Sequence, residues 1–105
     1  MPWFYLLAAG LLEIVWAYTM KQSNGFTRPV PSIITISAMA TSFWLLAVAM
    51  RTIPLGTAYT IWTGIGAVGA FIVGVVLLDE PLNAMRLLAA AFIIAGLILM
   101  KIASA

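Results

Sequence analysis

The chain has 105 residues, of which 65% are hydrophobic and 8% charged. Soluble domains carry a charge at about a quarter of their positions, so this composition excludes a water-soluble globular domain and indicates an integral membrane protein. The net charge is only +2, and no basic patch marks a polar face for nucleic acid. The sequence has no cysteine and no histidine, so it offers no disulfide framework, thiolate metal site or imidazole base.

Charged residues divide the chain into four long apolar intervals. About 20 apolar residues cross the hydrocarbon core of a bilayer, so each interval is long enough for one membrane span. We expect an all-α integral membrane protein whose single domain covers residues 1–105. Its four predicted transmembrane helices cover residues 3–21, 31–50, 55–78 and 84–101, each bound holding to within a few residues. A cleavable signal peptide is not expected, because the first twenty residues contain no Lys or Arg and three more spans follow.

The first span carries one carboxylic acid, Glu13, near its middle. An acidic residue at the centre of a membrane helix costs about 2.5 to 3.5 kcal/mol on insertion scales, so such residues are rare and usually mark ion pathways or proton relays. Helical spacing places Gly10, Trp16 and Ala17 on the Glu13 face, with small residues beside the acid and an indole one turn away. Glu13 is therefore the candidate binding residue. The alternative is a protonated carboxyl that only holds helices together.

Turn and helix-start signals separate the spans: Asn24-Gly25, Pro29, Pro31, Pro54 and Asn83. Pro29 and Pro31 are expected to close the first connection before the second helix begins. The short connection ahead of Pro54 predicts that the second and third spans form a tight antiparallel hairpin. Asn83 is the predicted N-cap of the fourth span.

The third span supplies a second set of candidate residues. Tyr59 and Trp62 lie one turn apart and can stack on a cation or donate hydrogen bonds, although aromatic packing near the membrane interface is an alternative. Gly64, Gly66 and Gly69 fall within six residues of one another. These glycines predict a kink, a hinge or tight helix packing, and the sequence leaves all three outcomes open.

The second span has one polar face, formed by Thr35 and Ser42. Ser42 matters for binding only if it meets Glu13, because a serine can also bond to the backbone of its own helix. The fourth span has no ionisable residue between Arg86 and Lys101, and its many small residues suggest a helix used for assembly.

Lys and Arg fall almost evenly on the two sides of the predicted spans. One side has Lys21, Arg28 and Arg86, and the other has Arg51, Lys101 and the terminal amine. Such a weak bias permits insertion in either direction, although one fixed topology is equally compatible with the count. Four helices can barely surround a cavity for a hydrated ion or a small molecule, and a lone charged residue needs partners on neighbouring helices, so we expect a homodimer.

The carboxyl group of Glu13, if buried within the membrane span, can bind either a proton or a cation. Burial disfavours its charged form, whereas a nearby cation favours it, so one site can hold either a proton or a cation. If the site faces one side of the membrane at a time, the result is exchange of a cation for protons, without any metal or nucleotide. Aromatic rings beside a carboxylate suit an organic cation, and the N–H fork of a guanidinium matches the two carboxylate oxygens.

Three segments resemble the small multidrug resistance family of proton-coupled exporters. They are G-x-x-E-x-x-W at Gly10–Trp16, S-N-G-F-T at Ser23–Thr27 and P-L-G-T-A-Y-T-I-W-T-G-I-G at Pro54–Gly66. Within that family, Trp16 and the W-T-G-I-G run resemble the guanidinium-exporter branch rather than the branch that exports polyaromatic cations.

The resemblance implies an antiparallel, dual-topology homodimer in the bacterial inner membrane, which exports guanidinium and small guanidinyl cations in exchange for protons by alternating access. It implies that Glu13 is shared between protons and substrate. A hydrogen-bonded ring would position Glu13, with Gly10 leaving room for the substrate; the ring comprises Trp16, Ser42, Tyr59 and Trp62. No cofactor besides the coupling proton and no enzymatic activity are expected. The alternatives are a broader exporter of quaternary ammonium compounds in the same family and a non-transporting assembly subunit.

Overall fold

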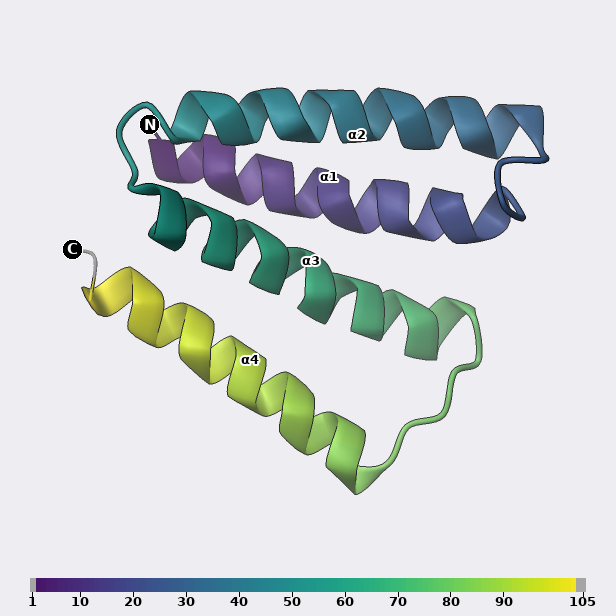
Figure 1. Cartoon of the computed structure of the whole chain (residues 1–105). Coiled ribbons are helices and arrows are strands. Elements are labelled where there is room, and N and C mark those ends of the chain that lie inside the picture. The colour runs from purple at the N-terminus through teal and green to yellow at the C-terminus, as the bar shows by residue number, and fades with distance from the viewer. Residues whose placement is uncertain (1, 104–105) are drawn as a thin grey trace.

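The computed structural model describes residues 2–103, which form four helices joined by short connections (Figure 1). Helix α1 spans Pro2–Gln22, α2 Pro29–Ala49, α3 Leu55–Leu77 and α4 Ala84–Ala103. Each helix has 20 to 23 residues and is long and apolar enough to cross a membrane. Residues 2–103 contain no strand, which confirms the predicted all-α class. Met1, Ser104 and Ala105 of the predicted domain lie outside the described residues.

The four helices lie side by side in a flat layer, with principal extents of 41 × 35 × 16 Å (Figure 1). Helix α1 packs against both α2 and α3, while α4 packs on the far side of α3. A short connection joins the second and third spans as predicted, but they do not form a tight hairpin, because α1 lies between α2 and α3. A short connection fixes the opposite directions of two helices, but side-chain shape decides which faces pack.

The proline and asparagine residues that signal helix starts lie at the starts of α2, α3 and α4, although two of the prolines lie further along the chain than predicted relative to the helix start. Pro29 and Pro31 lie inside the first turn of α2 rather than before it. The amides of a first turn have no acceptor within the helix, so proline removes no hydrogen bond there. Pro54 is the N-cap of α3. Asn83 caps α4, since its Oδ1 accepts a hydrogen bond of 2.9 Å from the backbone N–H of Arg86.

The connection between α1 and α2 is a compact turn built around Ser23, which is fully buried. Its hydroxyl donates to the carbonyl of Met20 at 2.7 Å and accepts from the backbone N–H of Phe26 at 3.0 Å. Asn24 and Gly25 both adopt positive φ angles, 51° and 72°, as the Asn-Gly signal predicts. Near this connection, the hydroxyls of Thr19 and Thr35 share a hydrogen bond of 2.6 Å and link α1 to α2.

The buried core lies toward the end of the layer that holds the N-terminus of α1. Its members come from α1, α2 and α3 and from the connection between α2 and α3: Leu6, Ala9, Leu46, Ala49, Ile53, Ala58, Ile61 and Trp62. Helix α4 contributes no buried residue within the described chain. The core thus holds α1, α2 and α3 together, whereas α4 packs mainly on α3 and contacts α1 through Lys101 and Trp3.

Candidate functional site

The side chain of Glu13 lies between α1 and α3 and packs directly on the backbone of Gly66. A Cβ atom at Gly66 would overlap Oε1 and Cδ of the Glu13 carboxyl group. Gly66 is itself buried, so the carboxyl occupies the space that any larger residue would fill. Gly66 therefore allows the acid to sit against α3 in the middle of the layer.

Two polar atoms at this position are buried and have no hydrogen-bond partner. They are Oε1 of Glu13 and Nε1 of Trp16, which lies one helical turn away. Buried polar atoms in folded proteins almost always have a partner, and an unpaired one costs about 1 to 3 kcal/mol. An unpaired carboxyl oxygen near an unpaired N–H donor is an arrangement that a bound ligand or proton can complete.

The hydroxyl of Ser42 links three helices by hydrogen bonds to Ala9 and Trp62, and neither bond involves the Glu13 carboxyl. Its hydroxyl donates to the carbonyl oxygen of Ala9 on α1 at 2.7 Å. The same oxygen accepts a hydrogen bond of 3.1 Å from the indole N–H of Trp62 on α3. Ser42 is fully buried, and Trp62 is only 6% exposed. This pair of bonds fixes the orientation of Trp62 beside the segment that carries Glu13.

The aromatic residues form a connected row across α1, α2 and α3. Tyr59 packs on Trp62 with ring centroids 5.5 Å apart. Phe43 makes edge contacts with both Trp62 and Trp16, at centroid distances of 5.7 and 6.4 Å. Sequence reasoning missed Phe43, because a position next to Ser42 does not place the two side chains on one helix face. Tyr59 and Phe43 are 53% and 47% exposed, so the row presents rings on the surface of the layer.

The remaining predicted glycines lie at close contacts between helices. A Cβ atom at each position would overlap a branched side chain of the neighbouring helix: Gly10 against Ile65, Gly69 against Ile14 and Gly64 against Leu97. Helix α3 runs without interruption from Leu55 to Leu77. In this conformation the glycines permit tight packing, and Ile65 occupies the space beside Gly10 that was expected for substrate.

Glu13 is separate from the other two acids of the chain. Asp79 and Glu80 lie in the connection between α3 and α4, where Glu80 forms an ion pair of 3.4 Å with Arg86. Within residues 2–103, no three metal-ligating side chains of the His, Cys, Asp or Glu type come together. The chemistry available at the site is therefore that of one carboxyl group among aromatic rings.

The Ser42 bonds lead to a prediction about stability. Replacing Ser42 with Ala leaves the buried Trp62 indole and the Ala9 carbonyl without this partner, so the free energy of unfolding should fall by about 1 to 3 kcal/mol. The matched control is Thr41→Ala, because Thr41 is exposed and its hydroxyl bonds, among the described residues, to the Ser37 carbonyl of its own helix. Denaturant titration of both variants in detergent measures the difference. Equal losses would contradict the role assigned to Ser42.

Comparison with known proteins gives a consistent result over nearly the whole chain. Residues 1–100 match the family model described as Small Multidrug Resistance protein. The chain is 56% identical over 104 residues to the guanidinium exporter of Citrobacter freundii, covering 99% of each chain. It is 55% identical to the guanidinium exporter of Yersinia pseudotuberculosis, covering 99% of this chain and 100% of the relative. The guanidinium exporter of Escherichia coli K12 is 54% identical, with 99% of each chain covered.

Proposed function

Because this chain belongs to the small multidrug resistance family, we propose that it exports guanidinium and small guanidinyl cations in exchange for protons. It is a multi-pass protein of the bacterial inner membrane, and its relatives are named as exporters rather than enzymes. The observation that carries the proposal is the buried, unpaired carboxyl oxygen of Glu13 within the first span. A cation or a proton bound to this oxygen would complete its bonding.

The chemistry of a carboxylate explains why the two ligands would exchange. A guanidinium ion can donate two parallel N–H bonds to the two oxygens of Glu13, and low local polarity strengthens this ion pair. A proton on the same carboxyl neutralises it and removes the attraction for the cation. Glu13 would therefore hold either a proton or the substrate, and an alternating-access cycle would convert a proton gradient into export.

The aromatic row supplies flat surfaces beside this carboxylate. Planar cations bind favourably over aromatic faces, and the site offers Trp16, Phe43 and Trp62 within one connected row. Ser42 holds the Trp62 indole in a single orientation. A fixed ring and a directional carboxylate together favour a flat cation with N–H donors over a bulky quaternary ammonium ion.

We further propose that two copies assemble as an antiparallel homodimer. The layer is only 16 Å thick, so one chain does not enclose the Glu13 site, and α4 leaves its apolar residues exposed. The basic residues are almost evenly divided between the two ends of the helices, which permits both insertion directions. The variant Asn24→Cys should be labelled by a membrane-impermeant thiol reagent from both sides of the membrane. Labelling from one side alone would rule out dual topology.

The function is tested with purified protein in sealed liposomes under an imposed pH gradient. We expect guanidinium to move against the direction of the protons, and the flux to vanish when the gradient is collapsed. Flux of a quaternary ammonium ion without guanidinium flux would instead show that this protein is an exporter of quaternary ammonium compounds. Absence of both fluxes in a folded protein would favour the non-transporting assembly subunit.

A further inference from the structure

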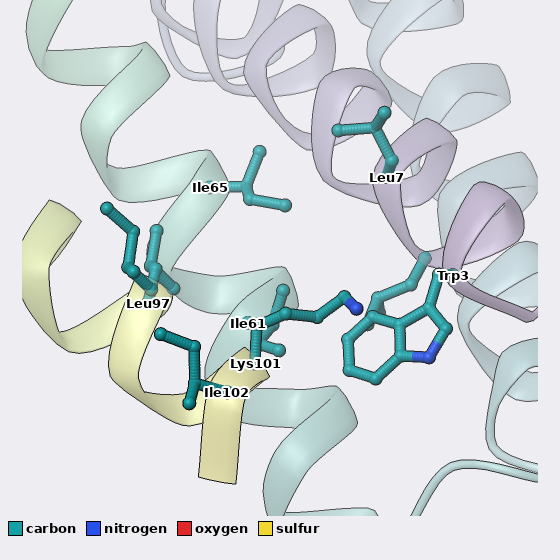
Figure 2. A pocket seen from close by; sticks show the side chains of 9 residues that line it. Trp3, Leu7, Ile61, Ile65, Leu97, Lys101 and Ile102 are labelled. Carbon is teal, nitrogen blue, oxygen red and sulfur yellow. The ribbon is translucent and has the colours of Figure 1, made fainter. Parts of the chain in front are cut away.

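A separate cavity of about 430 Å³ lies between α1, α3 and α4, near the N-terminus of α1 and the C-terminus of α4 (Figure 2). Its walls are mainly aliphatic and include Leu7, Ile61, Ile65 and Leu97. Glu13 does not line it, and Leu7 lies about 9 Å from Glu13 along the axis of α1. The cavity is within the size range of ligand pockets, which are usually apolar with a few placed polar groups.

The charged group of this cavity is Lys101, which reaches across from α4 toward Trp3 on α1 (Figure 2). The ammonium group lies 4.4 Å from the centroid of the Trp3 ring. Lys101 stands in the last turn of α4 and Trp3 in the first turn of α1, so both mark one end of the membrane spans. Tryptophan and lysine are the residues that anchor helices at the level of lipid headgroups.

The charges around the cavity favour an anionic occupant. No carboxylate lines it among the residues that the structure describes. Asp79 and Glu80 follow the C-terminus of α3, at the opposite end of the helices from Lys101. An occupant that fits must therefore combine a hydrocarbon part for the aliphatic walls with a negative group at the membrane surface for Lys101.

We propose that this cavity is a binding site for an anionic phospholipid. One acyl chain fills the space between α1, α3 and α4, and the headgroup phosphate pairs with Lys101. The bilayer presents such molecules in the required orientation, with the chain at the depth of Leu7 and the phosphate at the depth of Trp3. Basic pockets between transmembrane helices bind anionic headgroups in the same manner.

The test compares two lipids that share their acyl chains, dioleoyl phosphatidylglycerol and dioleoyl phosphatidylcholine, by native mass spectrometry of the full chain released from mild detergent. Wild type should bind the anionic lipid about fivefold more tightly, the difference expected for one basic residue at the membrane surface. Lys101→Gln should lose this preference and Lys101→Arg should keep it. Arg51→Gln is the matched control, because Arg51 lies at the same end of the helices but lines a different pocket.

A cavity-filling variant, Leu7→Trp, separates acyl-chain binding from attraction to the headgroup. It should weaken binding of both lipids, because the larger side chain occupies the space of the acyl chain. Equal effects of Lys101→Gln and Arg51→Gln would overturn the proposal, since general surface charge would then explain the preference. A change in the monomer–dimer ratio of Leu7→Trp, with lipid binding unaltered, would overturn it as well, because a second copy would then cover the cavity. These measurements do not depend on transport, so failure of the proposed function would leave them interpretable.

Discussion

Replacing Glu13 with Gln is expected to lower proton-driven guanidinium flux by about a hundredfold or more, because the loss of one partner of a buried ion pair costs about 3 to 5 kcal/mol. Gln keeps the size of the side chain and its ability to form hydrogen bonds, but it cannot ionise. The variant should therefore fold and still pack on Gly66, while guanidinium loses its counter-ion and the proton loses its acceptor. Flux in proteoliposomes, measured with and without a pH gradient, gives the result.

The matched control for this variant is Glu80→Gln. Glu80 is exposed, lies in the connection between α3 and α4 and pairs with Arg86 rather than with any residue of the site. Its loss should change flux less than about threefold, since exposed ion pairs contribute roughly 0 to 1 kcal/mol. Gradient-driven flux that survives in Glu13→Gln would refute the exchange mechanism and support a carboxyl that only holds helices together.

Replacing Gly66 with Ala should reduce flux by about tenfold and also destabilise the protein, because overpacking a close contact typically costs about 1 to 3 kcal/mol. The added methyl group would overlap the Glu13 carboxyl, so either the acid changes its orientation or α1 and α3 move apart. Both responses displace the carboxyl group that we propose as the binding site for cation and proton. The measurements are guanidinium flux and the free energy of unfolding in detergent.

Gly56→Ala controls for the general effect of alanine in α3. Gly56 lies in the same helix, but a Cβ atom there meets nothing within 4 Å. Alanine is favoured over glycine in helices by about 1 kcal/mol, so this variant should be neutral or slightly more stable. If Gly66→Ala and Gly56→Ala gave the same flux and stability, the close contact between Gly66 and Glu13 would contribute to neither transport nor folding.

Glu13, Gly66 and Ser42 contribute different parts of one arrangement. In the mechanism that we propose, Glu13 supplies the charge. Gly66 leaves the space for its carboxyl, and Ser42 orients the neighbouring Trp62. Removing the charge should abolish coupling without unfolding the protein. Removing the space should affect both flux and stability, whereas Ser42→Ala acts first on stability.

The class of protein, its four spans and the position of one acid, Glu13, within the first span all follow from the amino-acid sequence. These features depend on local properties: the length of each apolar interval, the position of turn residues and the cost of an acid within a span. The observed helix ends accordingly lie within two residues of the expected bounds. Asn83 likewise caps α4 as its position predicted, because a helix cap depends on residues three apart.

Which helix faces meet can be seen only in the folded structure. Two contacts show this together with the placement of α1 between α2 and α3. Glu13 meets Gly66, 53 positions away, and Trp62 bonds to Ser42, 20 positions away. Such contacts depend on the rotation of each helix about its axis and on the fit of side chains into the opposing surface, which a helical pattern does not specify. The same sequence signals are compatible with Ser42 facing Glu13, and only the packing directs Ser42 to Ala9 and Trp62.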